Sequence, residues 1–189
     1  MIKRNFVFVV LLISSIVLST TSCKKGEEDP FLSLKSRNSR LKGEWVLKSG
    51  EIVYTNPSGS NTTTYDGANK TVSGLVPYTE TYTESMTFEK DGTFNGVTVE
   101  DGETMIYEGT WAWLHKNKEN ETKNKEILTL CFTKYIEDGD TDIFTGVEVD
   151  YTLQLQKLSS KEMIIKYNTT YTSGSYTSSE VGTKTYEKK

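Results

Sequence analysis

Glu84 is the residue whose sequence surroundings favour chemistry most clearly. Tyr82, Met86 and Phe88 stand at alternate positions around it, separated by serine and threonine. Successive side chains of a β-strand point to opposite faces, so Glu84 is predicted to share a buried face with these three residues. An unpaired carboxylate is costly to bury, and we therefore expect a tyrosine hydroxyl or a ligand cation beside it. A strand end or bulge that turns Glu84 towards water is the alternative.

Three aspartates, Asp138, Asp140 and Asp142, alternate in a glycine-containing turn, a pattern that invites comparison with calcium sites. A calcium loop of the helix-loop-helix type requires Gly at its sixth position and Glu at its twelfth, where this sequence has Ile143 and Val149. The pattern therefore indicates a solvated acidic turn, and we expect no metal site.

The chain offers few residues suited to catalysis. His115 is its only histidine and stands at the edge of a charged loop, which argues against a histidine metal cluster or a histidine-centred triad. Cys131 lies in a predicted strand and is interpreted as a small packed residue rather than a nucleophile. Paired carboxylates could hydrolyse glycosides, yet most acidic residues stand in turns or on outward faces. We expect neither an enzyme nor a bound cofactor.

The elements that must position Glu84 are strands. Runs that alternate between apolar and polar residues recur along the chain, and short turns such as Asp91-Gly92 and Asp101-Gly102 separate several of them. The predicted strands are Trp45–Tyr54, 81–88, Thr93–Val99, Met105–Trp113, Ile127–Tyr135, Val147–Gln156, Met163–Tyr171 and Tyr176–Tyr186. About eight antiparallel strands, each with one buried face, predict an all-β, up-and-down barrel. A two-sheet sandwich of the same strands is the alternative.

One short helix is predicted before the first strand. Asp29 and Pro30 suit its N-cap and first turn, Phe31, Leu34 and Leu41 fall roughly on one side, and Gly43 ends it.

The first residues have the composition of an export signal. Lys3 and Arg4 precede an apolar run from Phe6 to Leu18, and small polar residues lead to Cys23. This order resembles a bacterial lipoprotein signal, which implies that residues 1–22 are removed and that Cys23 is acylated and anchors the protein to a membrane. Residues 23–30 then form an acidic tether and residues 31–189 a single domain. An uncleaved membrane span is the alternative, but the apolar run of about a dozen residues is short of the ~20 that a spanning helix needs.

Charge and cysteine content limit the partners. Removal of Lys3 and Arg4 changes the formal charge from -4 to -6, which argues against a nucleic-acid partner. Acylation of Cys23 leaves Cys131 as the only other cysteine, so an intrachain disulfide is excluded. The charged segment 24–29 also resembles the signal that directs some Bacteroidetes lipoproteins to the outer face of the outer membrane, with a plain solvated tether as the alternative. We expect an outer-membrane location.

Several segments carry a resemblance to one family. Gly43-Glu44-Trp45 is similar to the Gly-x-Trp signature that opens the barrel of lipocalins, and the runs 86–94, 109–111 and 158–163 resemble the lipocalin-like lipoproteins of Bacteroidetes. The resemblance implies that Trp45 plugs the closed end of a barrel and that the polar segment 55–78 is a loop that partly covers its open mouth. Lipocalins stack an arginine of the last strand on this tryptophan, a place for which this chain offers Lys184.

The barrel interior is the candidate binding site. The residues predicted to face inwards are Trp45, Tyr82, Glu84, Met86, Phe88, Tyr107, Trp111, Leu153 and Tyr167. Aromatic side chains with a few polar tips suit a small apolar or amphipathic ligand, so we expect a lipid-anchored binding protein. Eight strands leave an interior that side chains alone can fill, and the alternative is a structural or interaction lipoprotein that contacts protein or glycan at the cell surface. The sequence does not indicate an oligomeric state.

Overall fold

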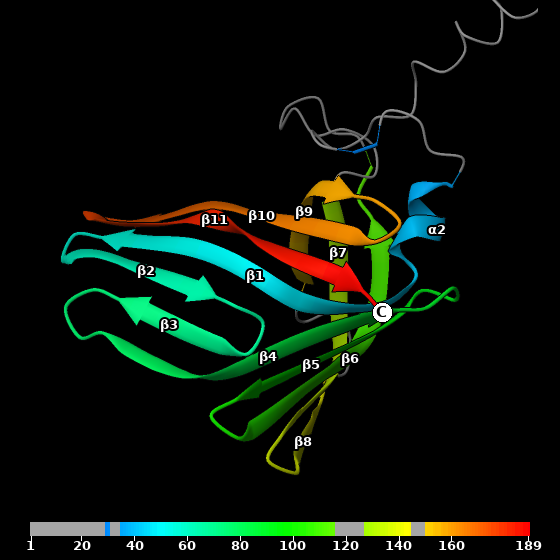
Figure 1. Ribbon diagram of the computed structural model, residues 1–189, viewed down its shortest axis with the longest axis horizontal. Helices are drawn as coiled ribbons and strands as arrows, with labels where there is room; N and C mark the ends of the chain where they lie inside the picture. The colour runs from blue at the N-terminus through cyan, green and yellow to red at the C-terminus, as the bar shows by residue number, and fades with distance from the viewer. Residues whose placement is uncertain (1–28, 31–34, 116–126, 145–149) are drawn as a thin grey trace, which may run out of the picture.

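The computed structural model describes residues 29–30, 35–115, 127–144 and 150–189, and it is an antiparallel β-barrel (Figure 1). Its elements are α2 (Arg37–Leu41), β1 (Gly43–Asn56), β2 (Gly59–Tyr65), β3 (Asn69–Ser73), β4 (Tyr78–Phe88), β5 (Thr93–Glu100), β6 (Glu103–Trp113), β7 (Ile127–Glu137), β8 (Asp140–Ile143), β9 (Asp150–Leu158), β10 (Glu162–Ser173) and β11 (Tyr176–Lys188). Residues 1–28, which include Cys23, lie outside the described residues. No helix in the described part of the chain has the length and apolar character needed to cross a membrane.

The sheet closes on itself, which confirms the predicted barrel and rules out the sandwich. Each strand from β1 to β6 pairs with its neighbour in sequence, β1 pairs with β11, and the ring continues through β10, β9 and β7 back to β6. Ten strands form the ring, and β8 lies outside it, paired only with the end of β7. Closure leaves few strand edges exposed, which is the main advantage of this architecture for an antiparallel sheet.

A fork between β1 and β4 makes the two ends of the barrel different. The first residues of β1, Gly43–Val46, pair directly with β4, whereas Gly50–Asn56 pair with β2. At the end that carries α2, the ring therefore consists of the eight strands that the sequence predicts. The hairpin of β2 and β3 enters between β1 and β4 at the other end and raises the number to ten.

The expectation that segment 55–78 is a loop is wrong. Its Thr-, Ser- and Asn-rich sequence forms β2 and β3, which extend the sheet beyond the main body of the barrel (Figure 1). Most of their side chains are exposed or only half-buried. Only Tyr65, at the end of β2, packs against the core. The sequence of the hairpin therefore lacks the apolar alternation by which the other strands are predicted.

The helix begins later than predicted. Its first described turn starts at Arg37 with Ser36 as N-cap, where the Ser36 hydroxyl accepts a hydrogen bond from the backbone N–H of Ser39. Asp29 does not serve as the cap, because its carboxylate is turned into the barrel end and paired with arginine. Residues 31–34, which include the predicted helical Phe31 and Leu34, lie outside the described residues.

The apolar core lies at the α2 end. Trp45, Phe88 and Tyr186 are completely buried there, and the indole N–H of Trp45 donates a hydrogen bond of 2.6 Å to the carbonyl oxygen of Leu41. Lys188, not Lys184, lies over the Trp45 ring, with its Nζ 5.0 Å from the ring centroid. The start of β1, the end of β11 and α2 together close this side of the barrel.

Candidate functional site

A cavity of about 290 Å³ lies in the barrel interior, adjacent to the packed end. It is bounded by strands β4, β5, β6, β7, β9, β10 and β11, so that its walls come from almost the whole ring. Six of the nine predicted interior residues line it, namely Tyr82, Glu84, Met86, Tyr107, Leu153 and Tyr167. The inward faces of strands that are distant in sequence therefore meet around one space.

The other three predicted residues lie elsewhere. Trp45 and Phe88 belong to the packed end and are fully buried without bounding the cavity. Trp111 is half-buried and packs edge-on against Phe88, with the ring centroids 6.2 Å apart. These residues close and stabilise the barrel end, and only the other six can contact a molecule in the cavity.

Most of the cavity wall is apolar. Its apolar surface comes from Met86, Phe94, Leu130, Leu153 and Ile165, all of which are nearly or completely buried. Gly96 leaves room for the ring of Phe94 from the same strand, because an added Cβ would lie 3.0 Å from Cζ of Phe94. Such a surface favours a ligand with a hydrocarbon or aromatic body.

One side of the cavity is polar. Lys184 donates from Nζ to Oε2 of Glu84 over 2.6 Å. The Tyr82 hydroxyl donates to the same oxygen over 2.8 Å, and the Tyr186 hydroxyl donates to Oε1 over 2.6 Å. These four residues, Tyr82, Glu84, Lys184 and Tyr186, are called the polar cluster below. This geometry agrees with the expected tyrosine partner for Glu84. The alternative, in which Glu84 turns towards water, does not hold, because the Glu84 side chain is only 16% exposed.

The lysine of the polar cluster is surrounded by aromatic rings. Nζ of Lys184 lies 4.5 Å from the ring centroid of Tyr65 and 5.3 Å from that of Tyr82. Cation–π contacts of this kind stabilise a cation that has lost most of its water. The cluster as a whole is neutral, because one carboxylate faces one ammonium group.

The tyrosines around the cluster are held in their neutral form. Burial, followed by the negative charge of Glu84, raises the pKa of Tyr82 and that of Tyr186 well above the ordinary value. Burial likewise raises the pKa of Tyr167, and burial and Glu84 raise that of Tyr65 to about 12. Tyr82 and Tyr186 therefore remain hydrogen-bond donors to the carboxylate at physiological pH.

Lys184 and Tyr186 are functional candidates that the sequence reasoning missed. From the sequence, Lys184 is assigned only as a partner of Trp45, and Tyr186 only as the end of a predicted strand. The alternation of β11 contains the signal, since residues 184 and 186 lie on one face of this strand and both are buried. A lysine at an inward position is a weak signal, because lysines are seldom buried.

The remaining chemical candidates lie away from the cavity. Asp138, Asp140 and Asp142 stand in and beside the exposed turn between β7 and β8, and the described residues contain no group of side chains suited to a metal ion. His115 is exposed after the end of β6, and Cys131 is partly buried in β7. Neither residue lines the cavity.

Comparisons with known proteins add no assignment. No protein-family model, curated protein or solved structure matches this chain significantly. Any function must therefore be argued from the site itself.

Proposed function

We propose that this protein is a non-enzymatic, lipid-anchored binding protein that holds one small amphipathic molecule in its barrel. The observation that supports this best is the cavity with an apolar wall and the polar cluster at one side. An amphipathic ligand would place its apolar body against Met86, Leu130 and Leu153 and its polar group towards the cluster.

The cavity volume and charge narrow the ligand class. An apolar cavity of about 150 Å³ is large enough to bind benzene, and the cavity here has about 290 Å³. It suits one or two rings, or a short branched chain. Because Glu84 and Lys184 neutralise each other, the ligand needs no net charge, and a hydroxyl or amide group is the polar end that fits best.

The site has a rim at which a ligand could enter. Tyr151 belongs to the cavity wall, yet its residue surface is 45% exposed. Tyr107, also in the wall, is only partly buried. These two tyrosines would cover an amphipathic ligand from the solvent side.

The proposed location follows from the first residues of the chain. The lipoprotein-like signal before Cys23 supports acylation of that cysteine and attachment to the outer membrane. At least two acyl chains make such attachment stable. A membrane is therefore proposed as one partner and a small molecule as the other, whereas the acidic balance argues against nucleic acid.

Native mass spectrometry of protein isolated from its own cells tests the proposal, with 2-naphthol as a defined probe in a calorimetric titration. A bound small molecule, or saturable binding of 2-naphthol at one site, is expected. Leu153→Trp should fill the cavity and abolish binding, whereas Val181→Trp, on a residue that is 52% exposed, should leave binding unchanged. An empty protein that does not bind 2-naphthol would contradict the proposal.

A second candidate function has its own observation. Leu75 and Val76 are 89% and 78% exposed at the turn between β3 and β4, and Tyr171 and Tyr176 are exposed near the neighbouring turn. Exposed apolar residues at loop tips are typical of contact surfaces. If the cavity proves empty, a structural lipoprotein that contacts protein or glycan through this end is the better proposal.

A further inference from the structure

Asp29 fastens the beginning of the domain to the α2 end of the barrel. Its carboxylate accepts hydrogen bonds from Nε of Arg37 over 2.9 Å and from Nη2 of Arg40 over 3.0 Å. The same carboxylate accepts a bond of 2.8 Å from the backbone N–H of Leu158, at the end of β9. Asp29 and both arginines are buried. The chain therefore leaves the barrel at a defined place.

The distance from this place to Cys23 is short. Asp29 lies six positions after Cys23, and an extended chain covers at most about 3.5 Å per residue, or about 20 Å in total. A membrane anchored at Cys23 would therefore lie close to the α2 end. The opposite turns are farther away by the length of the strands, which for the twelve residues of β10 is about 40 Å.

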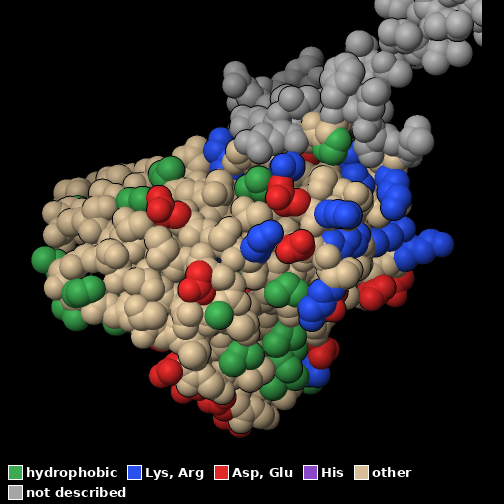
Figure 2. Space-filling view, in the orientation of Figure 1, with side chains coloured by type: hydrophobic (Ala, Val, Ile, Leu, Met, Phe, Trp, Pro, Cys, Tyr) green, Lys and Arg blue, Asp and Glu red, His purple; other side chains and the backbone are tan. Residues whose placement is uncertain are grey.

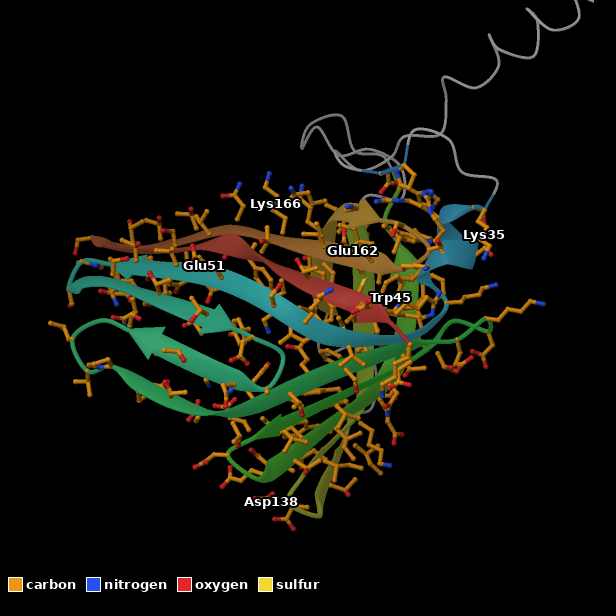
Figure 3. All side chains as sticks on the ribbon, in the orientation of Figure 1. Lys35, Trp45, Glu51, Asp138, Glu162 and Lys166 are labelled. Carbon is orange, nitrogen blue, oxygen red and sulfur yellow. The ribbon has the colours of Figure 1, made fainter. Side chains whose placement is uncertain are left out.

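Positive charge gathers at the same end. The positive side chains include Lys35 and Lys42, which flank α2, and Lys161 in the turn between β9 and β10. Lys188 at the end of β11 and Lys189 at the C-terminus complete the group. These five residues are called the basic end. On the face that Figure 2 shows, Lys and Arg side chains gather at this part of the molecule. Figure 3 places Lys35 beside α2. The pKa of Lys188 is lowered by burial and then by the charge of Lys35, as expected where cations are close together.

Acidic residues at this end are mostly matched by lysines. Glu44 pairs with Lys189 over 2.6 Å, and Glu187 lies 3.5 Å from Lys48. The turn between β4 and β5 contains Lys90 between two acidic residues. The net charge of the described side chains at this end is therefore positive.

The opposite end of the strands has the reverse charge. Asp101 and Asp138 occupy the turns after β5 and β7, and Asp140 and Asp142 follow in β8. The described turns at this end contain no lysine or arginine. Figure 3 shows Asp138 at the far end of these strands from Lys35. The charges of a protein with an acidic overall balance are thus separated along the barrel.

We propose that the basic end docks on the anionic headgroups of the membrane that holds Cys23, so that the acidic turns face away from the lipid. The inference rests on the proposed acylation of Cys23. Attraction between the lysines and the headgroups acts over about 8 Å at physiological ionic strength, which the short tether allows the basic end to reach. The same field repels the acidic turns, so both ends favour one orientation.

Fluorescence quenching on vesicles tests the orientation. The full acylated protein with Cys131→Ser carries one dye, at Ser160→Cys or at Ser175→Cys. These two serines are exposed in the turns at opposite ends of β10. The vesicles consist of phosphatidylcholine with or without phosphatidylglycerol and contain a lipid whose headgroup carries a quencher. An acylated Cys23 has no free thiol, so the number of dyes per chain reports acylation separately.

We expect stronger quenching of the dye at position 160 than at position 175, with a larger difference on anionic vesicles and a smaller one in high salt. The variant Lys35→Gln/Lys42→Gln should lose the increase that anionic lipid causes, because each lysine near an anionic surface contributes about a fivefold preference. The control variant Lys134→Gln/Lys166→Gln removes the same amount of charge away from the basic end. It should retain the increase in quenching that anionic lipid causes.

Two outcomes would overturn the inference. Quenching that is equal at the two positions, or stronger at 175, would contradict it while leaving the anchor intact. A second dye on the chain would show that Cys23 has a free thiol. If such a chain also failed to co-float with either kind of vesicle in a density gradient, both the docking and the proposed anchor would be contradicted. Binding of 2-naphthol is measured separately and reports only on the cavity.

Discussion

Replacing Glu84 with glutamine would leave the ammonium group of Lys184 in the barrel without its carboxylate. The side chain of Lys184 is 9% exposed and its Nζ lies 2.6 Å from Glu84. Removing one partner of a buried ion pair costs about 3 kcal/mol or more, because the remaining charge stays desolvated. We therefore expect Glu84→Gln to lower the free energy of unfolding by about 3 kcal/mol, equivalent to a fall of about 10 °C in Tm for a domain of this size.

Lys184→Met should have a similar cost for the opposite reason, since it leaves the carboxylate with only the hydroxyls of Tyr82 and Tyr186. The double variant Glu84→Gln/Lys184→Met removes both charges and retains an acceptor for the two tyrosines. Its cost should be about 3 kcal/mol rather than the 6 that additivity requires, which corresponds to a coupling energy of about 3 kcal/mol.

Urea denaturation, followed by circular dichroism, measures all four proteins. Glu108 and Lys134 form a matched pair on the outer surface, 3.2 Å apart but with side chains 43% and 34% exposed. The same double-mutant cycle at Glu108 and Lys134 should give a coupling energy of less than about 1 kcal/mol. Additive costs at Glu84 and Lys184, or a coupling no larger than that of the outer pair, would refute the reasoning that the cluster is desolvated.

Two further predictions concern the pH dependence of stability and the buried ion pairs of Asp29 with Arg37 and Arg40. Burial and Glu84 raise the pKa values of Tyr82 and Tyr186 in the folded state. The stabilisation that comes from these two residues is therefore fully present below the pKa of unfolded tyrosine, near 10. Above that pH, the free energy of unfolding should fall by about 1.4 kcal/mol per pH unit for each residue. Unfolding free energies measured between about pH 9 and pH 11 check this, and a flat profile would show that these hydroxyls titrate normally. Asp29→Asn leaves the buried Arg37 and Arg40 without their carboxylate and should cost about 3 kcal/mol in thermal denaturation. Glu44→Gln, at the exposed pair with Lys189, should cost less than about 1 kcal/mol. Equal effects of the two substitutions would argue against a stabilising role for the buried ion pairs of Asp29.

The fold was predictable to the extent that its strands bury one face. Tyr82, Met86 and Phe88 alternate in the sequence and lie on the inward face of β4, and Leu153 and Leu155 do the same in β9. The hairpin of β2 and β3 was not predictable by this signal, because only Tyr65 of its residues packs against the core. Its entry between β1 and β4 depends on the register of these strands, which local alternation does not specify.

The candidate site was predictable only in part. Glu84 was identified from its own strand, but its partner Lys184 is 100 residues away in the sequence. The two meet because β1 pairs with β4 along one edge and with β11 along its other edge. Trp45 was recognised as a residue of the closed end, whereas the cation over its ring proved to be Lys188.

Periodicity alone therefore determined that this chain forms antiparallel strands around a shared interior, since alternation of side chains is a local property of each strand. Which side chains face one another across that interior, and whether space remains between them, was decided only by the closure of the ring. Closure brings together residues from seven strands, and the volume left over depends on all of them at once.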